Sequence, residues 1–229
     1  ARRRRGRADP AVSAPDDGSD RSRFRLEALF SADATRVVHR REDGVREVVY
    51  SDAAGLLGEA WFGADEHVPF RARVVERDGA PGWEVEYHDD GNPSFAAPSV
   101  GDRTHGTTTQ WSTAGTVLSR CSFHRGTGTD PWWNDDGTLA EVWPFVDGAL
   151  HGWELWWSAG TVHEARYWRR GERHGPGFTL AEDGTVHVEL MLHGEEVDEG
   201  RYRAARERDG ELPSADPEGV IGEREMPEA

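Results

Sequence analysis

The chain has 229 residues and a formal net charge of −16 at pH 7, and all 27 of its basic residues are arginine. Only 36% of the residues are hydrophobic, but 10% are aromatic and ten are tryptophan, which favours a small β-sheet core built from large rings over a disordered chain. The single cysteine, Cys121, excludes an internal disulfide framework and a cysteine-rich zinc site, and no apolar run has the ~20 residues that a membrane-spanning helix needs.

The two ends of the chain are similar in composition and lack periodicity. Residues 1–23 combine arginine, aspartate, proline, serine and glycine, which predicts a disordered Arg-rich arm. Residues 199–229 are rich in glutamate, arginine, proline and glycine, which predicts a flexible acidic tail with a short helix near Tyr202–Arg208. Because five arginines lie in residues 1–7, the rest of the chain is more acidic than the whole.

Residues 24–78 are strand-like but irregular. Within this range, 46–55 and 56–62 together have the strand–turn–strand shape of one repeat unit. Terminal units of a repeat array are atypical because they cap it. We therefore expect a divergent capping β segment over residues 24–78.

From residue 79 to residue 198 the sequence repeats itself about every 23 residues. A turn glycine recurs in steps of 24, 22, 23 and 24 residues, at Gly91, Gly115, Gly137, Gly160 and Gly184. Acidic residues precede three of these glycines, as is typical of tight hairpin turns in which glycine accepts a positive φ. A period of this size marks an array of one supersecondary unit. The sequence predicts an all-β fold in which five two-stranded, antiparallel hairpin repeats form one elongated single-layer meander with disordered termini.

Positions counted from each turn glycine predict the core. Four residues before the glycine stand Tyr87, Trp111, Trp133, Trp156 and Leu180. Two residues after it stand Pro93, Val117, Leu139, Val162 and Val186. Eight residues after it, the last four copies have Phe123, Phe145, Trp168 and Leu192. These offsets are all even, as expected for side chains on one buried face of a strand.

Odd offsets in the central repeats carry a second set of aromatic side chains. Contiguous exposed aromatics mark contact sites, and arginine suits the rim of such a site. We therefore predict a partner-binding face formed by Trp153, Trp157, His163, Arg166, Tyr167 and His187. Two alternatives are that the sheet curls and that residues 24–78 fold over this face. A one-residue error in register would exchange the two faces.

Three histidines occupy equivalent positions in the repeats, at His105, His151 and His174. Neighbouring units are about 9–10 Å apart, whereas zinc needs nitrogen ligands at ~2.1 Å around one centre. We therefore expect a structural role, with the ring packed on a turn or bonded to a backbone carbonyl, and no metal. Cys121 is expected to be a buried, inert thiol. No catalytic or cofactor-binding motif is present, so the sequence predicts no enzyme and no cofactor.

A Gly-x-x-His-Gly pattern with aromatic residues at fixed spacings joins the copies. Its best copy runs Gly148-Ala-Leu-His151-Gly152-Trp153, followed by Trp156, Gly160 and Tyr167 and then by the next copy at 171–175. This pattern resembles the MORN repeat, and in particular the variant found in bacterial YwqK-type antitoxins of toxin–antitoxin loci. The resemblance covers residues 79–198 and implies a non-enzymatic protein that binds and neutralises another protein.

The acidic charge adds to what the resemblance implies. It favours a basic protein partner such as a toxin, and it repels nucleic acid and anionic membranes. The predicted location is the cytoplasm. Alternative functions are a scaffold, a membrane-docking module and a homodimer that pairs through a sheet edge or the aromatic face. The identity of the partner and the oligomeric state stay open.

Overall fold

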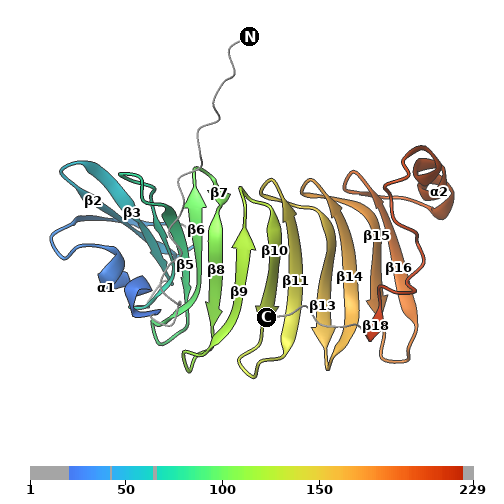
Figure 1. Ribbon diagram of the computed structural model, residues 1–229, viewed down its shortest axis with the longest axis horizontal. Helices are drawn as coiled ribbons and strands as arrows, with labels where there is room; N and C mark the ends of the chain where they lie inside the picture. Colours follow the sequence, from blue (N-terminus) through green and yellow to red (C-terminus); the bar gives the residue numbers. More distant parts are fainter. Residues whose placement is uncertain (1–20, 42, 64–65, 224–229) are drawn as a thin grey trace, which may run out of the picture.

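The computed structural model describes residues 21–41, 43–63 and 66–223. It confirms an all-β repetitive meander of antiparallel hairpins, with the strands side by side in one elongated layer and helical segments at both ends (Figure 1). The arm predicted for residues 1–23 lies outside the described residues up to residue 20. Its last three residues instead belong to a 3₁₀ helix, η1 (Arg21–Phe24).

Strand pairing divides the described strands into two sheets of nine strands each. Residues 24–78 supply the first strands of the first sheet, which therefore extends the array in line with the repeats. The first sheet contains β1 (Thr35–Arg40), β2 (Arg46–Asp52), β3 (Gly55–Phe62), β4 (Pro69–Val74), β5 (Gly82–Tyr87), β6 (Pro93–Val100), β7 (Arg103–Thr104), β8 (Gly106–Trp111) and β9 (Val117–Phe123). The second sheet contains β10 (Gly128–Trp133), β11 (Leu139–Val146), β12 (Ala149–Leu150), β13 (Gly152–Ser158), β14 (Thr161–Arg169), β15 (Glu172–Leu180), β16 (Val186–Leu192), β17 (Glu195–Glu196) and β18 (Gly222–Glu223).

The two sheets meet at a seam between β9 and β10. Among the described residues, no strand pairing joins these two strands, although they follow each other along the chain. A side chain from β8 bridges the seam: the Gln110 amide nitrogen donates to the Trp133 carbonyl at 2.8 Å, and its carbonyl oxygen accepts from the Trp133 amide at 3.0 Å. A glutamine amide offers one donor and one acceptor group, as a peptide unit does, so it can replace a rung of the missing ladder.

The turns at one edge of the array bond to one another from repeat to repeat. The Gly148 amide donates to the Gly126 carbonyl at 2.9 Å, and the Gly171 amide donates to the Leu150 carbonyl at 2.9 Å. Histidine side chains join this stack, because His174 Nδ1 accepts from the His193 amide at 3.0 Å and His105 Nδ1 accepts from the Arg125 amide at 3.1 Å. His105 and His174 therefore have a structural role, as the sequence predicts, but each ring bonds to a backbone amide and not to the expected backbone carbonyl.

One face of the array, which we call the covered face, carries the hydrophobic cores. Over the first sheet it is covered by η1, by α1 (Leu26–Leu29) and by the residue that follows α1. The Phe24 ring lies 4.7 Å from that of Trp83, and Phe30 stacks on Tyr50 with ring centroids 4.0 Å apart. The Tyr87 hydroxyl donates to the Phe24 carbonyl at 2.9 Å. The N-terminal segment thus completes a core that one sheet face cannot bury alone.

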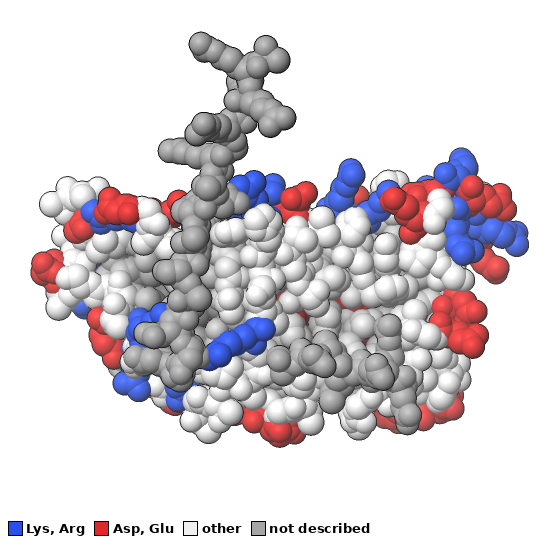
Figure 2. All heavy atoms as spheres, in the orientation of Figure 1, with Lys and Arg blue, Asp and Glu red and all other residues white. Residues whose placement is uncertain are grey.

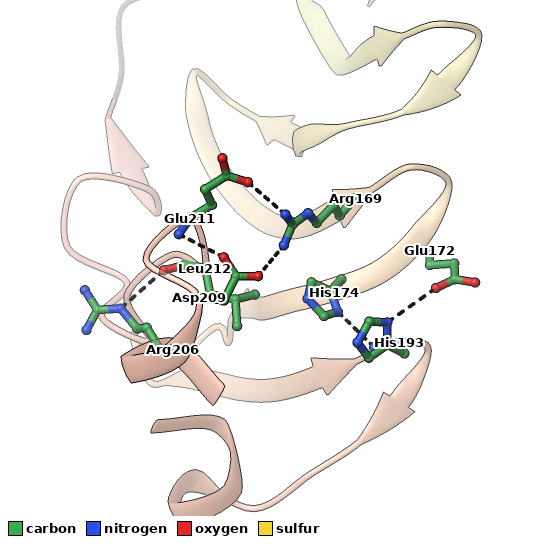
Figure 3. Close-up of polar contacts among 8 residues, drawn as sticks. All are labelled: Arg169, Glu172, His174, His193, Arg206, Asp209, Glu211 and Leu212. Carbon is green, nitrogen blue, oxygen red and sulfur yellow. Dashed lines mark hydrogen bonds and ion pairs between the residues drawn. The ribbon is translucent and has the colours of Figure 1, made fainter. Parts of the chain in front are cut away.

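Over the second sheet, the covered face is covered by residues 198–223, which we call the C-terminal strap. The strap contains helix α2 (Glu199–Arg208), capped by Asp198, and the short strand β18, which pairs with β14. Tyr202 is 2% exposed and packs with Leu190, Leu192 and Leu212. Arg169 pairs with both Asp209 and Glu211 of the strap, as Figure 3 shows.

The prediction of a flexible tail over residues 199–229 is therefore wrong for its described part, up to residue 223. The strap is polar on average, but a few apolar side chains fasten it. Val220 and Ile221 pack against the core around Val162, and Tyr202 packs in the separate cluster with Leu190, Leu192 and Leu212. The predicted short helix near Tyr202–Arg208 is present within α2.

Candidate binding face

A β-bulge recurs after the turn glycine and changes which side chains share a face. Opposite Glu86 and Tyr87 lie Phe95 and Pro93, so one residue between them is left without a partner. The same irregularity follows three of the other turn glycines, and the unpartnered residues are Ser94, Leu118, Ala140 and His163. A bulge of one residue shifts the alternation of side chains beyond it. The positions eight residues after the glycine, Phe123, Phe145 and Trp168, therefore lie on the face opposite the core.

A second irregularity affects the hairpin at Gly160. Its turn has two residues with positive φ, Ala159 at 49° and Gly160 at 80°, whereas the equivalent turns at Gly91, Gly115, Gly137 and Gly184 are one residue longer. Trp157, rather than Trp156, therefore pairs with Val162 and occupies the core column. The sequence prediction exchanged these two tryptophans because it counted from the glycine as if all turns had one length.

The six residues predicted as one binding face are divided between the two faces. Trp157 is 7% exposed in the core, and Trp153 and Tyr167 lie on the same covered face, with ring centroids 5.3 Å apart. Arg166 lies on the opposite face, with its guanidinium 4.8 Å from the Trp156 ring centroid and ion-paired with Glu164. His187 is exposed on that opposite face, and His163 is the bulge residue of β14. The predicted face does not exist as a single surface.

We call the face opposite the core the open face, because both described terminal segments pack on the covered face. The side turned to the viewer in Figure 2, which the strap crosses, is largely uncharged over the middle of the array and charged along its edges. The open face differs in its chemistry. Strand register places two sets of side chains on it, one on either side of the seam, which we together call the central row: Glu86, Phe95, Gln110 and Ser119 in the first sheet, and Trp132, Glu141, Trp156 and Glu164 in the second.

Phe123 is buried at 7% exposure, and the other rings of the open face, such as Phe95, Trp132 and Trp156, are half-buried. Phe95 stacks on Trp132 with ring centroids 5.2 Å apart, above the buried Gln110 and Ser119 that lie between them in the row. The Trp168 indole N–H donates to Glu154 Oε2 at 2.6 Å. In the second sheet, tryptophan and carboxylate alternate strand by strand along the central row. The rings are thereby held in fixed positions with their faces partly accessible.

Several carboxylates of the open face are desolvated. Burial, followed by the charge of Glu86, raises the pKa of Asp130 to about 7. Burial also raises the pKa of Glu86 and of Glu154, although nearby arginines act in the opposite direction. A cation placed against this face would favour the charged carboxylates and offset their desolvation. The exposed turn residue Asp136 shows the contrast, because hydrogen bonds from Thr138 lower its pKa.

The described residues show little that could support catalysis. Among them, no three His, Cys, Asp or Glu side chains are grouped so as to hold a metal ion. Burial raises the pKa of the Cys121 thiol to about 11, so this cysteine is protonated at neutral pH.

Sequence reasoning missed most of the open face, including Trp132, Glu141 and Trp143. One signal was present in the sequence. A glutamate precedes a tryptophan by 14 residues at two places, and both pairs are hydrogen-bonded on the open face, Glu47 with Trp61 at 3.1 Å and Glu154 with Trp168 at 2.6 Å. This spacing connects neighbouring strands of a hairpin and would have indicated which tryptophans lie beside carboxylates.

No helix among the described residues is long and apolar enough to cross a membrane. A scan against protein-family models and a search of curated proteins both give no match to this chain. The resemblance to MORN repeats and to YwqK-type antitoxins stays a prediction, and the open face is characterised by its geometry and charge alone.

Proposed function

We propose that this protein is a non-enzymatic binding module that captures a basic protein on its open face, in the manner of an antitoxin or immunity protein. The observation that carries the proposal is the alternation of Trp132, Glu141, Trp156 and Glu164 on successive strands. Tryptophan faces attract cations, and buried aromatic residues dominate binding energies at protein interfaces. Carboxylates between the rings supply the charge that such a partner requires.

The spacing of the row suits a partner with regularly placed cations. Strands are about 4.8 Å apart, so carboxylates on alternate strands recur every 9–10 Å or so with a tryptophan between them. The net charge of −16 steers a basic partner towards the protein, and the same charge opposes docking on an anionic membrane. The row thus favours protein capture over membrane docking.

The test is co-expression with the product of the adjacent gene, followed by co-purification and measurement of Kd. Trp156→Ala on the open face is expected to weaken Kd by about 30-fold, the ~2 kcal/mol typical of a hot-spot tryptophan. Val188→Ala is the matched control, because Val188 is 47% exposed on the covered face. We expect Val188→Ala to leave Kd unchanged.

Two outcomes would contradict the proposal. Loss of binding in Val188→Ala but not in Trp156→Ala would move the site to the covered face. Failure of the two proteins to form any complex, together with a growth defect from the adjacent gene product that this protein does not relieve, would argue against the antitoxin-like function.

Homodimerisation is a second candidate, favoured by the exposed edge strand at the start of the array. All six residues of β1 are exposed, with Val37 at 47% and Val38 at 55%, and β1 pairs with β2 on one side only among the described residues. An exposed, partly apolar edge can pair with a second copy. Light scattering over a concentration series tests this candidate. A monomer mass at all concentrations contradicts it, and a dimer that Val38→Lys dissociates supports it.

A further inference from the structure

A cavity of about 160 Å³ opens on the open face beside the seam between β9 and β10. Its lining combines rings and carboxylates, namely Phe95, Phe123 and Phe145 together with Glu84 and Asp130. We call this cavity the seam pocket. It draws residues from both sheets, because the seam places β9 of the first sheet next to β10 of the second.

The seam pocket exists because small side chains lie between larger ones. Ala97 and Thr108, both buried, occupy neighbouring positions on β6 and β8 and line the cavity. On one side stands Phe95, held in place by its stacking on Trp132 at 5.2 Å. On the other side stand Phe123 and Phe145, whose ring centroids are 6.1 Å apart. The walls are therefore fixed by ring contacts before any ligand binds.

Of the carboxylates that line the pocket, Asp102 is exposed, whereas Asp130 is half-buried. Glu84 is paired with Arg71 at 2.8 Å, and Arg103 is paired with Asp147 at 3.1 Å. The Asp130 carboxylate makes no hydrogen bond and no ion pair within the part of the chain that the structure describes. A half-buried carboxylate without a partner is costly, and a bound cation would offset that cost.

We propose that the seam pocket receives one guanidinium group, with Asp130 as its ionic partner and the three phenylalanine rings as its walls. A guanidinium is planar, is more weakly hydrated than an ammonium, stacks on aromatic rings and matches a carboxylate with two parallel hydrogen bonds. An ammonium is strongly hydrated, and the phenyl walls offer it no acceptors. In the basic partner, the group is an arginine side chain.

The identity of the partner rests on the proposed function, but the pocket can be tested without that partner. The probe is a short neutral peptide containing one arginine, titrated into the whole protein while amide and indole NMR signals are recorded. We expect shifts at Thr108, Asp130 and the Trp132 indole. A matched peptide with lysine is expected to bind about tenfold more weakly, because it forms neither the bidentate bond nor the ring stacking.

Two variants isolate the pocket. Asp130→Asn removes the charge with little change of shape, and Ala97→Leu fills the cavity but keeps the charge. Each is expected to weaken arginine-peptide binding by about tenfold or more. Glu196→Gln is the control, because it removes one charge from an exposed position on β17 at the far end of the array. We expect it to have no effect.

The source of the guanidinium is decided by a second probe, ethylguanidinium alone. Stronger binding of the peptide supports a protein side chain, and equal binding identifies a small guanidinium compound as the ligand of the same pocket. If neither probe shifts these signals at millimolar concentration, or if both variants bind as the wild type does, the inference is overturned. If the partner still binds to the Asp130→Asn and Ala97→Leu variants, the guanidinium site is contradicted but the proposed function stands. If guanidinium compounds bind but no partner complex forms, the proposed function is contradicted but the guanidinium site stands.

Discussion

The covered face and the open face are built from the same strands but have opposite surroundings. On the covered face, Val85, Val162 and Ala165 are fully buried under the two terminal segments. On the open face, tryptophans and carboxylates shield one another only partly. The difference shows that in this array the repeats provide the strands, whereas the segments outside the repeats decide which face becomes the core. The face they leave uncovered has aromatic rings and carboxylates side by side.

The largest difference in stability is expected between variants of Trp111 and Trp156, two tryptophans that occupy equivalent positions in the repeat pattern. Trp111 is 1% exposed on the covered face, so Trp111→Ala is expected to cost about 3–5 kcal/mol in the free energy of unfolding. Trp156→Ala on the open face is expected to cost about 1 kcal/mol, mainly the cation–π contact with Arg166. Urea denaturation of both variants measures the difference. Equal losses would mean that the open face is also a core.

The next effect concerns the pH dependence of stability. Asp130 has a raised pKa in the folded protein, so its contribution to stability is present below about pH 4 and is lost as the pH rises towards 7. Asp130→Asn removes this loss, and the variant should be more stable than the wild type by about 4 kcal/mol at pH 8 and equal to it near pH 3.

The control for this measurement has the opposite sign. The pKa of Asp136 is lowered by hydrogen bonds from Thr138, so Asp136 stabilises the fold above its usual pKa and loses that contribution as the pH falls. Asp136→Asn should therefore be less stable than the wild type at neutral pH and equal to it in acid. Urea denaturation at a series of pH values compares the two variants, and the same trend in both would contradict the contrast between open face and turn edge.

A smaller effect is expected where the strap is fastened to the covered face. Arg169→Met removes the ion pairs with Asp209 and Glu211, and about 1–2 kcal/mol of local stability should be lost, because each partly exposed pair contributes at most about 1 kcal/mol. Hydrogen exchange should accelerate in α2 and at Tyr202 but not in the first sheet. Arg203→Met, at an exposed position of α2, is the matched control. Unchanged exchange in Arg169→Met would show that apolar contacts alone hold the strap.

The smallest effect on stability is expected at His174, in the turns that bond to one another along one edge of the array. Burial, followed by the charges of His193 and Arg169, lowers the pKa of His174. Its contribution to stability is therefore present above its usual pKa and is lost as the pH falls below about 6.5. Loss of the bond from the His193 amide should cost about 1 kcal/mol, seen as faster exchange of that amide at pH 5 than at pH 7 after correction for intrinsic rates. His174→Asn keeps an acceptor, and an unchanged pH dependence in this variant would exclude His174 as the cause.

The period of the repeat was enough to predict the hairpin meander and the parts of the core closest to each turn. Tyr87, Trp111, Leu139 and Val162 are buried as expected, because they precede the bulge along each hairpin. Phe123, Phe145 and Trp168 could not be placed, because the bulge residues Ser94, Leu118, Ala140 and His163 share no side-chain property. A bulge is a main-chain irregularity, and its position became visible only through strand register.

The candidate site was harder to predict for a related reason. Trp156 and Trp157 are adjacent, and a turn one residue shorter decides which of them is buried. The strap was missed because its composition is polar and only Tyr202, Leu212, Val220 and Ile221 fasten it. Whether this segment is ordered depends on the tertiary contacts of these few apolar side chains, and the average composition of the segment does not reveal such contacts.

The return of β18 to β14 limits the size of the array. The strap leaves the last strand, passes α2 and must reach back across β16 and β15 to pair with β14. An additional repeat inserted between β14 and α2 would lengthen that path by about 9–10 Å. A strap of the present length would then end short of its pairing site. The length of the strap therefore limits how many strands can lie between β14 and α2.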